Sequence, residues 1–148
     1  MLQRVQTLYL VGSIILFILM LCFPLGYITM GSNTASLSIF GFQIGHEYHS
    51  TLVVSVVSFI SLICQIAIIL LFNNRLLQMR LVIFNIVLQI AFYLAVIASV
   101  LMYSDGSNSS FTIGWTIFLP AITIILNILA YRAIHKDEAL VRSLDHLR

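Results

Sequence analysis

Charge is the scarcest property of this 148-residue sequence, since only 8% of its residues are Asp, Glu, Lys or Arg and 61% are hydrophobic. Soluble domains carry about 25% charged and about 45–50% apolar residues. A water-soluble fold of this composition would expose large apolar patches and aggregate. The net charge of +2 is too small to indicate a nucleic-acid-binding protein. The composition therefore predicts a single membrane domain over residues 1–148 that contacts lipid.

Cysteine is almost as scarce. The two residues of this type, Cys22 and Cys64, both lie inside apolar runs, and no CxxC motif occurs. Neither a redox pair nor a thiolate metal site is expected, and the two thiols are predicted to be buried and inert. No cofactor is predicted.

Four long hydrophobic runs stand out. A spanning helix needs about 20 predominantly apolar residues, and the segments that meet this length are approximately 5–24, 51–72, 81–103 and 112–134. Their interiors contain no Asp, Glu, Lys, Arg or His. Arg132 lies near the C-terminal end of the last segment, outside its interior. The first run is expected to be a retained helix, because it is longer than a signal-peptide core and no small-residue cleavage motif follows Phe23. The predicted fold is an all-α integral membrane protein, a four-transmembrane-helix antiparallel bundle.

The distribution of basic residues predicts the orientation of this bundle. Four spans place both termini and the turn 73–80 on one side, and all seven Lys and Arg residues fall there. The positive-inside rule then gives an N-in/C-in topology. The long loop 25–50 and the short turn 104–111 lie outside, and the tail 135–148 is cytoplasmic.

The outer loop has the composition of strands. The segments YITM and SLSIFGFQI flank the turn-forming GSNTAS, which predicts a small antiparallel β-hairpin on the outer ends of the helices. Its aromatic residues Phe40, Phe42 and Tyr48 are expected near the lipid headgroups.

The nearest approach to a chemical site is HEYHS at 46–50. On a helical turn, His46 and His49 share a face, with Glu47 adjacent, and this set suits zinc or copper. The alternative is a solvated cap before the second span, with Ser50 or Thr51 near the N-cap position.

Polar side chains form one stripe on each predicted helix. Four amides are expected to face inward in the cytoplasmic half of the bundle: Gln65, Asn85, Gln89 and Asn127. Because a carboxamide in hydrocarbon must find partners, these residues form either an interhelical cluster that fixes register or a polar pocket for a ligand. Pro120, in the middle of the fourth span, is predicted to bend that helix.

The C-terminal segment YRAIHKDEALVRSLDHLR holds seven of the twelve charged residues. Its Leu residues recur at helical spacing, which predicts an amphipathic extension of the fourth helix that contacts lipid, a partner protein or another copy. A solvated extension that only sets topology is the alternative. The candidate contact residues are Arg132, Lys136, Asp137, Glu138, Arg142 and Arg148.

The opening MLQRVQTLYLVGSIILFILMLCFPL, the turn NNRLLQMRL and the charged ending together resemble a bacterial family of small four-pass membrane proteins, described only as a domain of unknown function. The resemblance covers essentially the whole chain. It implies an inner-membrane location and brings no activity, cofactor or catalytic residue. The arrangement of loops is also similar to that of claudins, but the claudin outer-loop Trp and paired cysteines are missing, so this similarity implies no function.

These features disfavour several functions. Spans without carboxylates or imidazoles lack the groups for intramembrane catalysis, for ion-coupled transport and for a haem clamped between helices. The favoured hypothesis is a non-enzymatic accessory or structural subunit of an inner-membrane assembly, bound to a membrane-protein partner or to a second copy. An uncoupled transporter or channel for small molecules or lipids, built on the amides, is the first alternative. A metal-binding protein at the membrane edge, using His46, His49 and Glu47, is the second.

Overall fold

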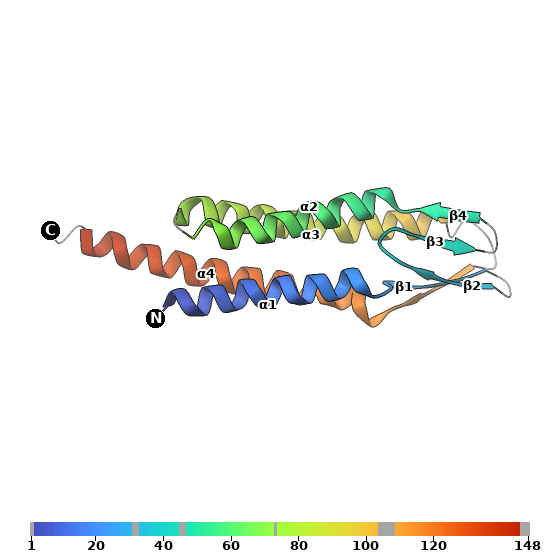
Figure 1. Ribbon diagram of the computed structural model, residues 1–148, viewed down its shortest axis with the longest axis horizontal. Helices are drawn as coiled ribbons and strands as arrows, with labels where there is room; N and C mark the ends of the chain where they lie inside the picture. Colours follow the sequence, from blue (N-terminus) through green and yellow to red (C-terminus); the bar gives the residue numbers. More distant parts are fainter. Residues whose placement is uncertain (1, 31–32, 45–46, 73, 104–108, 146–148) are drawn as a thin grey trace.

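The computed structural model describes residues 2–30, 33–44, 47–72, 74–103 and 109–145. Four long helices lie side by side along the molecule (Figure 1). They are α1 (Leu2–Cys22), α2 (Leu52–Leu70), α3 (Arg75–Tyr103) and α4 (Leu119–Asp145). All four are long and apolar enough to cross a membrane, as the hydrophobic runs predicted.

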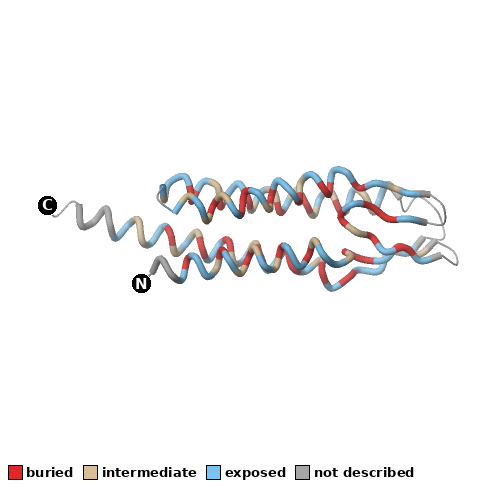
Figure 2. The backbone as a smooth tube through the Cα atoms, viewed as in Figure 1, coloured by how far each residue is buried: buried red, intermediate tan, exposed pale blue. Residues whose placement is uncertain are grey.

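The outward faces of these helices are unusually apolar. Only 28–33% of the residues in each candidate span are buried inside the protein. Buried residues recur on the sides of the helices that face one another (Figure 2). Large apolar side chains elsewhere on the helices stay exposed, including Leu8, Ile63 and Leu94. Apolar surface of this extent needs a solvent other than water, which indicates a membrane protein.

One helix boundary differs from the prediction and another agrees with it. The segment 73–80 was expected to be a basic turn, but α3 already begins at Arg75. Good helix-forming residues dominate this segment, and the Gln78 backbone N–H donates to the Asn74 carbonyl. At the other end of the chain, α4 continues to Asp145. The predicted helical extension of the fourth span is therefore present.

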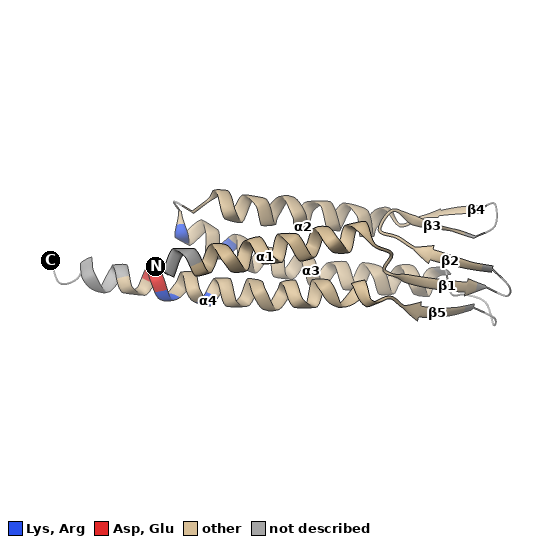
Figure 3. Cartoon of the chain, turned by 60° about the horizontal axis from the view of Figure 1, so that its bottom comes forward, with Lys and Arg blue, Asp and Glu red and all other residues tan. Residues whose placement is uncertain are grey.

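Both chain ends and the α2–α3 connection lie at one end of the molecule, which we call the terminal end (Figure 1). The strands lie at the opposite end, which we call the strand end (Figure 1). Described Lys and Arg residues gather at the terminal end (Figure 3).

The helices enclose two separate apolar clusters. Helix α1 packs most extensively against α4, and α2 against α3. The first cluster, at the strand end, contains Phe17, Met20, Leu25, Ile28, Ala35, Leu37, Ile39, Phe42, Val54, Phe92, Val96 and Leu119. The second, toward the terminal end, contains Leu10, Cys64, Ile68, Met79, Val82, Ala130 and Ile134.

Five described strands cover the strand end: β1 (Gly26–Met30), β2 (Asn33–Leu37), β3 (Gly41–Ile44), β4 (Glu47–Ser50) and β5 (Ser109–Ile113). Strands β1 and β2 form an antiparallel hairpin, as expected for this loop, but β2 occupies most of the segment GSNTAS that was predicted to be the turn. The expectation of a single hairpin was wrong, because β3 and β4 form a second two-stranded sheet.

Strand β5 was not expected either, since 104–111 was interpreted as a simple turn. It pairs antiparallel with β1 and completes a three-stranded sheet of order β2–β1–β5. The Gly114 N–H then donates to the Leu25 carbonyl. A Cβ atom at Gly114 would lie 2.7 Å from that carbonyl oxygen. Glycine is therefore required where the β5 strand passes into the fourth helical segment.

The aromatic residues of the outer loop lie in different environments. Phe42 pairs with His49 and Tyr48 with Gln43 in the β3–β4 sheet, so Phe42 and Tyr48 point to opposite faces, whereas Phe40 precedes β3. Phe40 and Tyr48 are exposed, but Phe42 is only 2% exposed and belongs to the first cluster. The prediction that all three face the headgroups was therefore wrong for Phe42. Gly41, just before it, has φ of 149°, a conformation that favours glycine.

Pro120 does not lie in the middle of a helix. A 3₁₀ turn, η1 (Trp115–Phe118), precedes α4, which places Pro120 at the second residue of α4. Proline is tolerated in the first turn of a helix, because the N–H that it lacks has no partner within the helix there. The predicted mid-helix position of Pro120 was wrong, because β5 and η1 occupy the residues assigned to the start of the span.

Candidate functional site

A layer of buried polar side chains lies between the two apolar clusters, and we call it the polar layer. On α1, α3 and α4 its members fall between residues of the first cluster and residues of the second. On α2, Ser58 and Ser61 do so, and Gln65 lies beside Cys64 at the edge of the second cluster. Each is 0–1% exposed: Ser13, Ser58, Ser61, Gln65, Asn85, Gln89, Thr123 and Asn127. All four predicted amides belong to this set, so their expected inward orientation is what the structure has.

Helical spacing explains how the layer forms. Ser58, Ser61 and Gln65 follow steps of three and four along α2, as do Asn85 and Gln89 on α3 and Thr123 and Asn127 on α4. Such steps keep side chains on one helix face. The face is the same one that carries the buried apolar residues of each helix. The polar layer is therefore a cross-section of the shared interior rather than a separate surface.

The hydroxyl groups of the layer have partners. Ser58 donates to the Val54 carbonyl at 2.7 Å and Thr123 to the Pro120 carbonyl at 2.8 Å, both within their own helices. Ser13 likewise donates to the Leu10 carbonyl at 2.8 Å. Ser61 instead reaches across to α3, where its Oγ donates to Asn85 Oδ1 at 2.8 Å. This last bond ties α2 to α3 at the level of the layer.

The amides are different. Among the described residues, Gln65, Gln89 and Asn127 have no hydrogen-bond partner for either the nitrogen or the oxygen of the amide. Asn85 Nδ2 also has no partner there. The network of bonds among the four amides that the sequence suggested is thus absent from the described contacts. A carboxamide offers two donors and two acceptor positions. Leaving one unpaired in an apolar interior costs about 1–3 kcal/mol.

The chemistry open to this layer is limited. Amides and hydroxyls do not ionise near neutral pH, so they supply no general acid or base. They can donate to and accept from a neutral polar molecule. The layer suits binding or passage of such a molecule, or specific helix association, better than bond-making chemistry.

The predicted metal site falls largely outside the described residues. His46 lies outside them, and of Glu47 only the backbone is described, as the first residue of β4. His49 packs its ring against Phe42, with centroids 5.3 Å apart. The helical turn assumed for HEYHS was wrong, because residues 47–50 form a strand. Within the described part of the chain, no three His, Cys, Asp or Glu residues gather closely enough to hold a metal ion.

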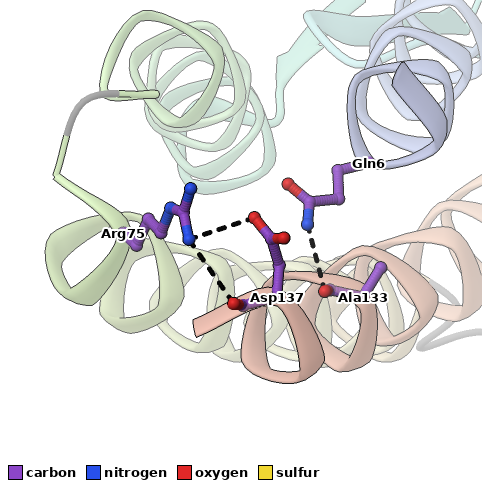
Figure 4. Close-up of polar contacts among 4 residues, drawn as sticks. All are labelled: Gln6, Arg75, Ala133 and Asp137. Atoms are coloured by element: carbon purple, nitrogen blue, oxygen red, sulfur yellow. Dashed lines mark hydrogen bonds and ion pairs between the residues drawn. The ribbon is translucent and has the colours of Figure 1, made fainter. Parts of the chain in front are cut away.

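At the terminal end, the charged residues of α4 occupy distinct environments. Arg132 and Lys136 are exposed, and Asp137 and Glu138 are half-buried. The side chain of Arg142 and all of Arg148 lie outside the described residues. Asp137 pairs with Arg75 at the start of α3, with Nη1 and Oδ2 3.1 Å apart (Figure 4). Gln6 on α1 donates to the Ala133 carbonyl at 3.0 Å beside this pair.

Sequence reasoning missed this terminal-end arrangement. Arg75 and Asp137 are 62 residues apart, and Gln6 and Ala133 are 127 apart. The only available signal was that Gln6, Arg75 and Gln78 are polar residues beside apolar runs, a pattern that topology alone also explains.

Comparison with known proteins places the chain in a family. No curated protein matches it. The model of one family, described as Domain of unknown function (DUF4293), matches residues 2–147. This match confirms the resemblance to a family described only as a domain of unknown function. The protein therefore belongs to the DUF4293 family.

Proposed function

We propose that this protein is a non-enzymatic accessory subunit of a bacterial inner-membrane assembly, with both termini in the cytoplasm. The observation that carries this proposal is the length of α4. Its C-terminal part runs past the N-terminus of α1 and past the α2–α3 connection (Figure 1). A helix that projects beyond its neighbours has a surface that the rest of the chain does not cover.

The exposed side of α4 just before this projection, level with the first turns of α1 and α3, is cationic. Arg132 and Lys136 are four residues apart, so they share one face of α4, and both are exposed. The neighbouring acidic residue Asp137 forms an ion pair with Arg75. The proposed partner is therefore another membrane protein with an acidic surface next to the bilayer. The positive-inside rule supports the cytoplasmic placement of this end.

Site-specific photo-crosslinking in native membranes tests the proposal. A crosslinking amino acid at position 132, 136 or 140 should capture one protein at a constant stoichiometry, and Lys136→Glu or Arg132→Glu should weaken the capture. Position 63, on the exposed lipid-facing side of α2, is the matched control for random contacts. Crosslinks to lipid alone, to the same chain alone or equally at position 63 would contradict an accessory role.

A second candidate function is favoured by the unpartnered amides of the polar layer. A buried layer of free donors and acceptors supports an uncoupled transporter or channel for a small polar molecule or a lipid. Cysteines at Gln65, Gln89 and Asn127 distinguish the two functions. In a packed accessory subunit they should resist water-soluble maleimides, and in a conduit they should react.

A further inference from the structure

A small cavity lies at the terminal end of the helices, away from the polar layer. It has a volume of about 150 Å³ and is lined by α1, the end of α2 and the start of α3. Its lining residues are Gln6, Thr7, Leu10, Ile69, Phe72, Arg75 and Gln78. One part of the wall is therefore polar and carries a cation, and the other part is apolar.

The polar wall is held in a fixed orientation. Gln6 and Gln78 are only 7% and 6% exposed. Gln6 Nε2 donates to the Ala133 carbonyl and Gln78 Nε2 to the Ile68 carbonyl, both at 3.0 Å. Ile68 lies in the last turn of α2, where carbonyls lack partners within the helix. These bonds determine which end of each amide is nitrogen and hold both side chains in the wall.

Arg75 supplies the charge. Its Nη1 lies 3.1 Å from Asp137 Oδ2 and 3.5 Å from the Asp137 carbonyl. A guanidinium has five N–H donors in a planar fork, so one nitrogen engaged with Asp137 leaves the others for a further anion. Arg75, Asp137 and Gln6 approach one another from three helices (Figure 4). The side chain of Arg75 is 29% exposed, so it remains reachable from outside.

We propose that this cavity binds the phosphodiester group of a membrane phospholipid, with Arg75 on the phosphate. Arginine is the side chain best suited to the geometry of phosphate oxygens. A cavity of about 150 Å³ holds a group of about the size of benzene, which is enough for a phosphate. The apolar wall of Leu10, Ile69 and Phe72 takes the start of an acyl chain. Phe72 is 65% exposed, so this wall continues to the outer surface of the protein.

Two features favour a lipid over free phosphate. The cation lies where α3 begins, at the end of a membrane-length helix, and headgroups occupy that level of a bilayer. The apolar wall has no use in binding an inorganic ion. The proposal depends on the membrane placement of the helices and is independent of the accessory role, because crosslinking through α4 does not involve this cavity.

Native mass spectrometry of the delipidated protein in detergent tests the site. The probes are dioleoyl phosphatidylglycerol, dioleoylglycerol, which has the same chains without phosphate, and inorganic phosphate. The phospholipid should bind one to one and the diacylglycerol much more weakly. Arg75→Gln should lower the affinity for the phospholipid roughly tenfold to a hundredfold, since it removes one or more charge-assisted hydrogen bonds.

Two matched variants separate binding from folding and from general charge. Asp137→Asn breaks the same ion pair as Arg75→Gln but keeps the cation, so it should bind the phospholipid at least as tightly as the unmodified protein. Arg80→Gln removes an exposed cation from the same helix and should leave the affinity unchanged. Equal losses in Arg75→Gln and Arg80→Gln would overturn the proposal, as would equal losses in Arg75→Gln and Asp137→Asn. Equal binding of diacylglycerol, or full displacement of the lipid by millimolar inorganic phosphate, would also overturn it.

Discussion

Replacement of a buried amide in the polar layer gives the most direct test of the structure. Gln89 is 0% exposed, and neither of its amide atoms has a hydrogen-bond partner among the described residues. Methionine has an unbranched side chain of similar length without the amide. Gln89→Met therefore removes a polar group from the interior while leaving its volume nearly unchanged.

The expected magnitude comes from the cost of the unpaired amide. Mutational data place that cost at about 1–3 kcal/mol. Gln89→Met should raise the free energy of unfolding by a similar amount, about 1–3 kcal/mol. If the amide were hydrogen-bonded across helices, the same change would instead lower stability by about 0.6–2 kcal/mol. The two cases differ in sign, so a moderately precise measurement decides between them.

Reversible unfolding in mixed micelles of SDS and a mild detergent, followed by circular dichroism, provides the measurement. Ser61→Ala is the control, because it removes the hydrogen bond from Ser61 to Asn85 Oδ1 and no unpaired group. This control should lose about 0.6–2 kcal/mol. A loss of stability in Gln89→Met as large as that in Ser61→Ala would refute the description of Gln89 as an unpaired amide.

Three further predictions concern the framework around the layer. Gly114→Ala should destabilise the protein by about 1–3 kcal/mol in the same assay, because the new Cβ atom would lie 2.7 Å from the Leu25 carbonyl oxygen. Gly12→Ala should be neutral or stabilising, because the nearest atom would lie 3.6 Å from its Cβ atom. Equal effects at the two glycines would contradict the close approach at β5. Asp137→Asn should cost only about 0.2–1 kcal/mol, because the pair with Arg75 is partly exposed, and a loss of several kcal/mol would mean that the pair is fully desolvated. The orientation can be tested in a protein whose Cys22 and Cys64 are replaced by serine. A cysteine in place of the exposed Ser36 should react with an impermeant maleimide on intact cells, and a cysteine in place of the exposed Asn74 should react only after permeabilisation. The reverse pattern would show that the proposed orientation is inverted.

The helices could be predicted from the sequence because the signal is local. A run of about 20 apolar residues has few alternatives in a chain of this composition. The inward positions of Gln65, Asn85, Gln89 and Asn127 are also predictable from helical spacing alone. What spacing cannot give is the partner of each side chain, which is why a network among the four amides was expected, whereas the described contacts contain only the bond from Ser61 to Asn85.

The features that sequence reasoning missed all depend on contacts between distant segments. Strand β5 exists because β1 has a second edge, where residues as far apart along the chain as Gly26 and Ile113 pair. Without that pairing, SSFTI was assigned partly to a turn and partly to a helix. The error then placed Pro120 in mid-helix. The ion pair of Arg75 with Asp137 depends in the same way on how α3 meets α4, and the adjacent cavity on how α1, α2 and α3 meet.

The placement of the polar layer bears on the choice between the two candidate functions. Toward the strand end it is closed by the first apolar cluster, where Phe17 and Phe92 are 0% exposed. Toward the terminal end it is closed by the second cluster, where Ile68 and Ile134 are 0% exposed. A polar molecule that crossed the protein through the amides would have to displace both clusters, and this would expose several buried apolar side chains. In this conformation the layer is therefore a sealed compartment.

The closure of the polar layer by both apolar clusters argues against a continuously open pore. It agrees with slow exchange of a tightly held molecule or with specific helix association. Lipid chains are as apolar as leucine, so apolar packing alone discriminates poorly between a helix partner and the surrounding lipid. The polar layer can discriminate only among the helices of this chain, because each of its side chains is 0–1% exposed and cannot reach a separate protein. It therefore supports specific packing of α1–α4, and contact with an external partner is left to exposed residues such as Arg132 and Lys136 on α4.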